Sequence, residues 1–302
     1  MLSINFLPFE RPHLMLRTLQ NWSNISENYK DKFTINIHTK IDDTFFNQIK
    51  DEFNKNNILL NIIYHPSHHY MTKIYSSSST EAEYSMKIDE DIFINFHVLE
   101  YIIDNLPLLN NESTLILTPT LSTGIPSIEM FIEDVCTDDE KNILFNLFKN
   151  THIPSIWGAN YTSLNYHKKT WDYGHYYNMV ATLSHHYKGI HPVRVNRQPQ
   201  LLLCDLCIKY IDKIKNKNNY YIDCKHITYI CNTVFIIKTD IWRNIINNKS
   251  LFRDDYDEVP LNLYMKNHNH KVCFIRNSNG IHPSYNTLVG YSEISDKFFN
   301  AL

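Results

Sequence analysis

Two aspartates separated by one residue, Asp89 and Asp91, carry the clearest chemical signal in this sequence of 302 residues. They follow the β-prone residues 85–88, and an apolar run comes after them. Side chains alternate along a strand, so a strand that ends in Asp-x-Asp places both carboxylates on the same side. Hard oxygen ligands of this kind suit Mg²⁺ or Mn²⁺, and either ion readily holds a diphosphate. A solvated acidic turn has the same letters, so the surrounding elements must decide between the two interpretations.

The segments before the motif alternate between strand and helix patterns. This alternation is typical of a parallel α/β sheet, whose ligands bind outside the carboxyl ends of the strands. Asp89 and Asp91 lie at one of those ends, which favours the metal interpretation. The expected strands are 3–8, 33–38, 58–64 and 84–88, and the expected helices are 14–22, 45–54 and 71–84.

The segments after the motif are less regular. Residues 151–200 are irregular and rich in aromatic side chains, and we interpret them as a lid or acceptor wall. We expect a loop at 119–126 and a turn at 277–280. The expected strands are 113–118, 227–238 (one long strand or a pair) and 272–275, and the expected helices are 92–106, 127–135, 138–150, 201–214, 239–247 and one starting near 259.

Four segments along the chain carry a resemblance to a known family. They are, in order, Asn5-Phe6-Leu7-Pro8 with Arg11, then Met86-Lys87-Ile88-Asp89-Glu90-Asp91, then Tyr256-Asp257-Glu258-Val259-Pro260, and Ile281-His282-Pro283. In this order they resemble the nucleotide-sugar glycosyltransferases of the GT-A fold, most like family-2-type members, over nearly the whole chain. The resemblance implies an α/β, Rossmann-like mixed and mostly parallel sheet flanked by helices. It also implies one domain over 1–302, with a nucleotide-sugar-binding half (1–110) and an acceptor-binding half (111–302) that contains the irregular insert 151–200.

The resemblance also implies a metal site that holds the diphosphate of a nucleoside diphosphate sugar, with a UDP-sugar as the expected donor. Asp91 would be the direct ligand of Mn²⁺ or Mg²⁺, and Asp89 would contact the ribose or the metal and its water. His282 would be the third protein contact, since Mn²⁺ accepts one imidazole nitrogen among oxygens. Such an ion stabilises the charge that develops on the departing diphosphate.

The remaining site residues are likewise implied by the resemblance. An inverting enzyme needs a carboxylate to take the proton of the acceptor hydroxyl, and both Asp257 and Glu258 qualify. The implied donor contacts are Pro8, Phe9, Arg11, Thr39 and Lys73.

The acceptor is left open by the sequence. Between positions 186 and 253 the sequence has twelve Lys and Arg residues but only four Asp. This excess fits either a solvated basic face or a groove for an anionic acceptor. The candidates are a glycan, a lipid or a protein, or a hydroxymethylated DNA base that is flipped out and stacked on an aromatic side chain. The Asn-, Ile- and Lys-rich composition suits a virus or phage, but also a bacterium.

Two alternatives compete with a glycosyltransferase. A sugar nucleotidyltransferase would have a similar sheet, but the sequence lacks the Gly-rich phosphate loop expected near its start. A non-catalytic nucleic-acid-binding protein would use the basic face at 186–253, although the net charge of −3 gives it no general attraction to nucleic acid.

The sequence predicts a cytoplasmic protein, in the host cytoplasm if viral, without membrane insertion. Its start lacks the pattern of a signal peptide, and no apolar run reaches the ~18 residues of a membrane span. The six Cys are therefore expected to be free thiols. A zinc site from Cys204, Cys207, Cys224 and Cys231 is the alternative, but the Leu-rich surroundings favour Cys204 and Cys207 as packed helix positions. The oligomeric state stays open.

Overall fold

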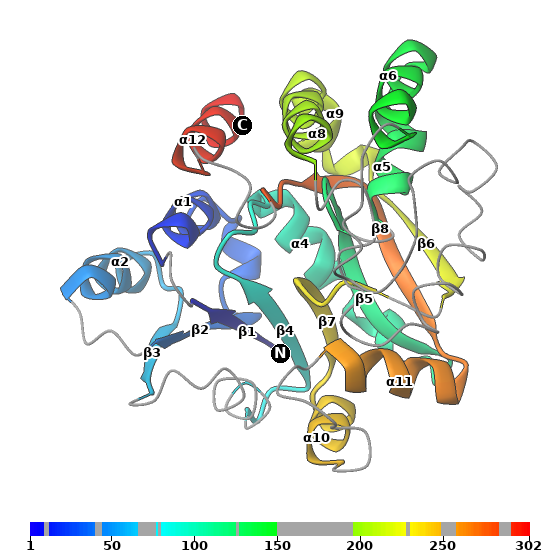
Figure 1. The fold of residues 1–302 in the computed structure, drawn as a ribbon. Helices are drawn as coiled ribbons and strands as arrows, with labels where there is room; N and C mark the ends of the chain where they lie inside the picture. Colours follow the sequence, from blue (N-terminus) through cyan, green and yellow to red (C-terminus); the bar gives the residue numbers. More distant parts are fainter. Residues whose placement is uncertain are drawn as a thin grey trace.

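An eight-stranded mixed sheet forms the centre of the chain, in the order β3-β2-β1-β4-β7-β5-β8-β6 (Figure 1). The computed structural model describes residues 1–8, 12–39, 44–65, 77, 80–124, 127–149, 196–227, 230–248, 258–283 and 291–302. Four of the seven strand pairings are parallel, which confirms the predicted α/β class with a mixed, mostly parallel sheet flanked by helices. The strands are β1 (Leu2–Leu7), β2 (Phe33–Thr39), β3 (Leu60–Tyr64), β4 (Tyr84–Asp89), β5 (Thr114–Leu121), β6 (Tyr221–His226), β7 (Val234–Lys238) and β8 (Lys271–Gly280).

The half of the sheet formed by β3, β2, β1 and β4 agrees closely with the sequence patterns. All three of its pairings are parallel, and the connecting helices α1 (Pro12–Trp22) and α2 (Thr44–Lys55) lie where their apolar spacing predicts them. The helix expected at 71–84 is wrong over residues 80–83, which are not helical. Most of the rest of that segment lies outside the described residues.

The other half of the sheet departs more from the sequence patterns. Strand β7 runs antiparallel to both β4 and β5, and β6 runs antiparallel to β8. Strand β5 continues through Pro119 into the segment expected to be a loop, which a shift in its pairing with β8 accommodates. The turn expected at 277–280 is wrong, because β8 continues to Gly280 with Asn277 at a positive φ of 61°. Strand β6 was not predicted as a strand.

The helices that follow β4 start and end somewhat differently from expectation. Helix α4 begins at Phe96, not at residue 92, because Asn95 caps it by accepting a hydrogen bond from the Val98 N–H. Helix α8 already begins at Arg197, so residues 197–200 of the expected irregular insert are helical. Residues 151–195 lie outside the described part of the chain. The remaining elements are α4 (Phe96–Asn105), α5 (Ser127–Val135), α6 (Asp138–Lys149), α8 (Arg197–Lys209), α9 (Ile211–Ile214), α10 (Thr239–Asn247), α11 (Glu258–His268), α12 (Tyr291–Ala301), and the 3₁₀ helices η1 (Glu27–Tyr29), η2 (Leu106–Asn110) and η8 (Lys217–Asn219).

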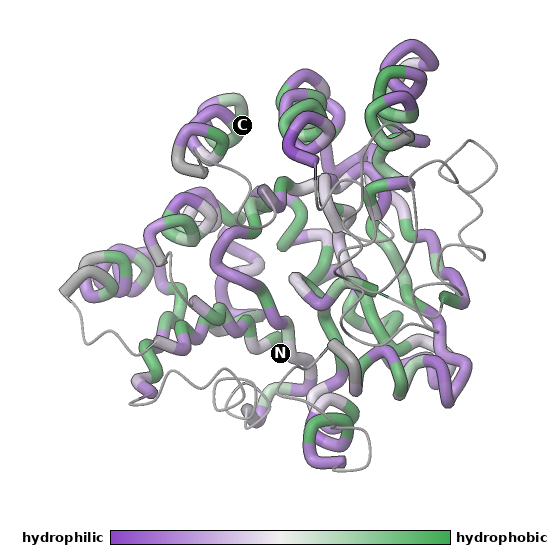
Figure 2. The backbone as a smooth tube through the Cα atoms, viewed as in Figure 1, coloured by the Kyte–Doolittle hydropathy of each residue, from purple (hydrophilic) through white to green (hydrophobic). Residues whose placement is uncertain are grey.

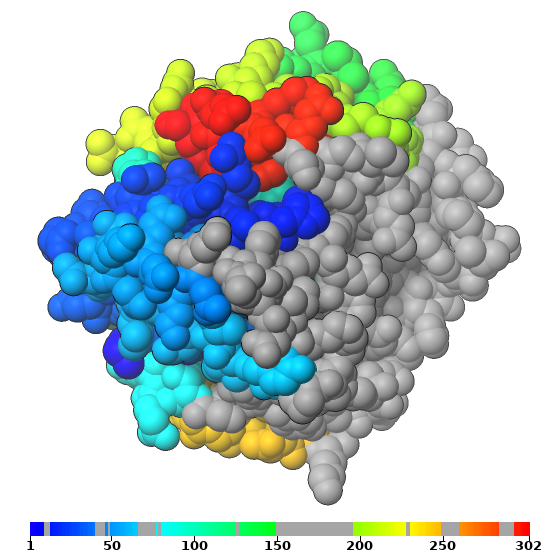
Figure 3. Space-filling model, turned by 90° about the vertical axis from the view of Figure 1, so that its left-hand side faces the viewer, coloured from blue at the N-terminus to red at the C-terminus, as the bar shows by residue number. Residues whose placement is uncertain are grey.

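Two apolar clusters cover opposite faces of the sheet. In β7, Val234 and Ile236 belong to a cluster with α1, α2 and α4, whereas Phe235 and Ile237 belong to one with α5, α6, α8, α10, α11 and α12. Figure 2 shows the resulting alternation of green and purple along the helices. Helix α12 packs beside α1, where Arg17 pairs with Asp296 at 3.1 Å, and Figure 3 shows the red C-terminal helix against the blue N-terminal region.

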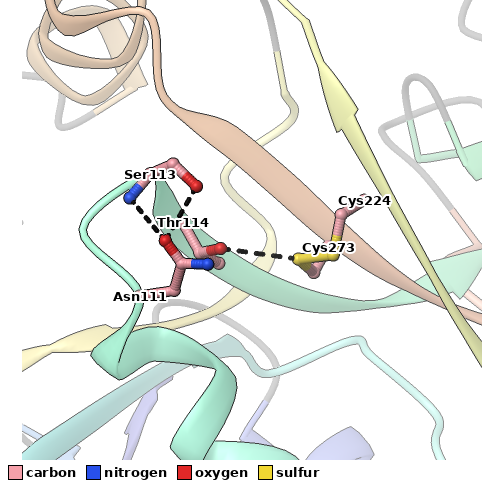
Figure 4. Close-up of a disulfide and its surroundings, with 5 residues drawn as sticks. All are labelled: Asn111, Ser113, Thr114, Cys224 and Cys273. Carbon is pink, nitrogen blue, oxygen red and sulfur yellow. Dashed lines mark hydrogen bonds between the residues drawn. A yellow bond between two sulfur atoms is a disulfide. The ribbon is translucent and has the colours of Figure 1, made fainter.

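One disulfide corrects the expectation of six free thiols. Cys224 of β6 and Cys273 of β8 are directly opposed in the antiparallel pair and are joined by a disulfide (Figure 4). The other four cysteines are free and buried. Cys224, one of the four residues of the alternative zinc site, is used in this disulfide, and burial raises the pKa of the Cys204 thiol to about 12. The alternative zinc site therefore gains no support.

None of the helices in the described part of the chain combines the length and apolar character needed to cross a membrane.

Candidate functional site

Asp89 ends β4 and is held by the neighbouring strand. Its carboxylate pairs with Lys87 Nζ at 3.0 Å, and its backbone N–H donates to the Thr233 carbonyl at 3.0 Å. Lys87 is only 2% exposed and also donates to the carbonyl oxygen of Asn232 at 2.7 Å. Residues i and i+2 of a strand point to the same face, so the side chains of Lys87 and Asp89 are neighbours on one face of β4. The segment that leads into β7 thus fixes Asp89 through both its backbone and its side chain.

Asp91 lies beyond the strand and meets a residue from the far end of the chain. Its Oδ1 is 3.7 Å from Nε2 of His282, and both residues are buried. A two-way backbone bridge brings them together, because the Phe93 N–H donates to the Ile281 carbonyl at 2.8 Å and the reverse bond is 2.9 Å long. The sequence predicted this meeting of Asp91 and His282 only through the family resemblance.

Gly280 permits the close approach behind this bridge. A Cβ at that position would lie 2.7 Å from the Phe93 carbonyl oxygen and 2.9 Å from Ile94 Cγ2. Backbone atoms cannot give way cheaply at such distances, so only glycine fits here without displacement.

The end of β5 holds His282 from the other side. The Thr123 hydroxyl oxygen lies 2.6 Å from the His282 carbonyl oxygen and 3.0 Å from its Nδ1. The backbone N–H of His282 donates to Ser122 Oγ at 3.2 Å, and the Ser122 N–H donates to the Gly280 carbonyl at 3.0 Å. Ser122, Thr123 and His282 are all buried, so the position and the orientation of the imidazole are both defined.

A metal ion is compatible with Asp91 and His282. Metal–ligand bonds are about 2.0–2.2 Å long, so two atoms that are 3.7 Å apart can both reach one ion. Among the described residues, no group of three or more His, Cys, Asp and Glu side chains is arranged to hold a metal. Mg²⁺ commonly keeps several waters and binds through one or two carboxylates and substrate phosphates, so two protein ligands are chemically sufficient. Asp89 forms an ion pair with Lys87 and does not join Asp91 and His282 in a group of three ligands.

A buried polar layer lies on the same face of the sheet, over β1, β2 and β3. The ring nitrogens of His38 lie 3.0 Å from Asn5 Oδ1 and 3.1 Å from His65 Nε2. Asn36 donates to Asn5 Oδ1 and to Ser3 Oγ, which extends the network across the strands. The register pairs Asn5 with Lys87, so this layer is continuous with the lysine below Asp89. The face that carries the site is therefore polar over the parallel half of the sheet.

Two of the expected donor contacts lie near this layer. Thr39 ends β2 and is buried, and its carbonyl oxygen accepts a hydrogen bond from the His65 N–H at 2.7 Å. Pro8 follows β1 and is buried as well. Of the other predicted residues, Glu258 is the first residue of α11, whereas Phe9, Arg11, Lys73 and Asp257 lie outside the described residues.

The basic segment is partly neutralised by acids from other elements. Lys209 pairs with Glu140 of α6, and Lys217 pairs with Asp104 of α4 at 2.8 Å. Contacts with Lys209, Thr137 and Tyr210 outweigh the cost of burial at Glu140 and lower its pKa from 4.5 to about 2. Lys215 and Lys225 pair with Asp212 and Asp223, at 2.9 and 3.1 Å, but these two acids are already among the four aspartates of the segment. The excess of basic residues therefore does not translate directly into a free basic surface.

Sequence reasoning missed three residues that shape the site, namely Lys87, Ser122 and Thr123. Lys87 had a local signal, because a lysine two residues before Asp89 on a buried strand must share its face. Ser122 and Thr123 had none, since their segment was expected to be a loop and their partner lies about 160 residues away.

Comparisons with known proteins add little at the level of sequence. No protein-family model and no curated protein matches this chain. Among solved structures, it is similar to TarS 1–349 from S. aureus, with 9% identity, a TM-score of 0.42, and coverage of 99% of this chain and 71% of that one. It is also similar to apo mouse xyloside xylosyltransferase 1, with 10% identity, a TM-score of 0.33, and coverage of 98% and 92%.

Proposed function

We propose that this chain is a metal-dependent glycosyltransferase that moves a sugar from a nucleoside diphosphate sugar, a UDP-sugar, to an acceptor hydroxyl. The observation that carries the proposal is the meeting of Asp91 and His282 beyond the carboxyl end of β4. In a sheet of this type, ligands bind at that edge. Carboxylate and imidazole are a donor set that Mn²⁺ accepts, with Mg²⁺ as the alternative.

The protein residues divide the work in this proposal. Asp91 and His282 hold the ion, whose positive charge stabilises the leaving diphosphate. Asp89, held by Lys87, contacts the ribose or a water of the ion. The nucleotide binds at the carboxyl ends of β1 and β2, beside the buried polar layer. Its contacts there are Thr39, the segment around Pro8, Phe9 and Arg11, and Lys73.

The reaction is a substitution at the anomeric carbon. The acceptor oxygen forms a new bond to this carbon while the bond from the carbon to the diphosphate oxygen breaks. If the configuration is inverted, Asp257 or Glu258 takes the hydroxyl proton. The start of α11 at Glu258 supports placing this acid pair at the beginning of a helix.

The acceptor in this proposal is a glycan hydroxyl in preference to a hydroxymethylated DNA base. The ion pairs of Lys209 with Glu140 and of Lys217 with Asp104, two acids from outside the segment 186–253, weaken the case for a basic groove. Binding to DNA through such a groove would fall steeply with salt concentration. Tight, salt-sensitive DNA binding would therefore reverse this preference.

A panel of nucleotide sugars, assayed with and without Mn²⁺, tests the proposal. We expect one donor to release its nucleoside diphosphate in a metal-dependent manner. Slow transfer of its sugar to water should make this release measurable even before the acceptor is identified. Release of pyrophosphate from a nucleoside triphosphate and a sugar phosphate would indicate a nucleotidyltransferase instead. A panel in which no donor is bound or turned over would refute the proposal.

A further inference from the structure

The Thr123 hydroxyl has one proton, and two atoms of His282 lie within reach of it. Oγ1 is 2.6 Å from the His282 carbonyl oxygen and 3.0 Å from Nδ1. A carbonyl oxygen only accepts hydrogen bonds, so the shorter contact requires the hydroxyl proton. The hydroxyl oxygen is then the acceptor in the contact with Nδ1, and Nδ1 must carry a proton.

We infer that Thr123 is a positioning residue that fixes His282 in the tautomer with its proton on Nδ1, so that the Nε2 lone pair faces Asp91. This inference rests on the proposed metal site and deepens it. A metal-bound histidine needs a bare nitrogen toward the ion, and a hydrogen bond at its other nitrogen normally secures that arrangement. Thr123 supplies this bond from just beyond β5, a strand that contains neither proposed metal ligand.

The surrounding hydrogen bonds hold both the ring and the backbone of His282 in place. Ser122 accepts from the His282 backbone N–H, and Thr123 accepts from the ring and donates to the carbonyl of the same residue. The imidazole and its peptide group are thus held by two consecutive residues at the end of one strand. Thr123 and Ser122 are both fully buried, so water does not compete for these bonds.

Loss of the hydroxyl would change where the proton of a neutral imidazole resides. Without an acceptor at Nδ1, the proton is better placed on Nε2, where the Asp91 carboxylate 3.7 Å away attracts it. That tautomer presents an N–H toward the site and cannot bind a cation through Nε2. Thr123 thereby controls metal affinity without touching the metal or the substrate.

Two variants separate this role from simple packing. Thr123→Val keeps the shape of the side chain and removes the hydroxyl, whereas Thr123→Ser keeps the hydroxyl and removes a methyl group. We expect Mn²⁺ affinity, measured by electron paramagnetic resonance titration, to fall about 10–100-fold in Thr123→Val. Thr123→Ser should keep most of the wild-type affinity.

The tautomer itself can be measured without metal, donor or turnover. Long-range ¹H–¹⁵N correlation spectra of protein labelled at histidine, at fixed pH, report which ring nitrogen is protonated, and His282→Gln assigns the signal. The wild type and Thr123→Ser should show the proton on Nδ1, and Thr123→Val should show it shifted to Nε2. A proton on Nε2 in the wild type, or an unchanged tautomer and Mn²⁺ affinity in Thr123→Val, would overturn the inference.

The wild-type spectrum decides the tautomer even if Thr123→Val fails to fold. The predicted tautomer in a protein that binds no Mn²⁺ would support the role of Thr123 and count against the metal in the proposed function. Failure of the inference and failure of the proposed function therefore give different results.

Discussion

The two aspartates of one short motif lie in different surroundings. Asp89 is held locally, by a lysine two residues away and by the strand beside it. Asp91 lies beyond the end of β4 and faces His282, which follows β8. Asp89 thus has a permanent cation at 3.0 Å, whereas Asp91 faces an imidazole that is cationic only when protonated. We therefore expect the fold itself to position Asp89, and Asp91 to be the carboxylate that contacts the proposed ion.

The largest expected effect comes from removing the charge of Asp91. Asp91→Asn should abolish Mn²⁺ binding and lower kcat/KM by about 10²–10³-fold or more, because the leaving diphosphate loses its electrostatic stabilisation. Mn²⁺ titration and the rate of nucleoside diphosphate release measure the two effects.

Asp89→Asn is the matched control for this prediction. It makes the same change of charge two positions earlier in the motif, yet it should lower Mn²⁺ affinity by only about tenfold, the low end for a residue that acts through a ligand or its water. Equal loss of Mn²⁺ binding in both variants would show that the two aspartates act as one ligand pair, against the division described here.

The surroundings of Asp89 and those of Asp91 also differ in how far the sequence predicts them. Strands β1, β2 and β4 are short runs whose apolar and β-branched pattern is local, so their positions and the position of Asp89 follow from the sequence. The side of Asp91 depends on strand β8, where Asn277 adopts a positive φ and the expected turn is part of the strand. Tertiary pairing overrides local turn preference there.

The contacts of Thr123 and Gly280 were beyond sequence reasoning for the same reason. Thr123 meets a partner 159 residues away, and Gly280 meets the backbone of Phe93. No periodicity encodes such contacts. The roles given to His282 and Asp257 came from the family resemblance, and the structure brings His282 to Asp91 while Asp257 stays a prediction.

The next prediction disturbs only the side of Asp91. Gly280→Ala should lower the free energy of unfolding by about 1–3 kcal/mol, because the new methyl group overlaps the Phe93 carbonyl oxygen. It should also weaken Mn²⁺ binding, since the bridge between Phe93 and Ile281 sets the separation of Asp91 and His282. Urea unfolding and Mn²⁺ titration measure the two effects, and a variant of wild-type stability would contradict the close approach.

The smallest expected effect is the loss of the ion pair between Lys87 and Asp89, and a double-mutant cycle isolates its contribution. Lys87→Met, Asp89→Asn and the double variant should reveal a coupling of about 1–2 kcal/mol in the free energy of unfolding, because the lysine is buried while the aspartate is partly exposed. The same cycle with Lys87→Met and Asp91→Asn should give a coupling below about 0.5 kcal/mol. A comparable coupling to both aspartates would mean that Lys87 serves the whole motif. A coupling to Asp89 alone would show that the lysine positions Asp89 and has no part in holding Asp91.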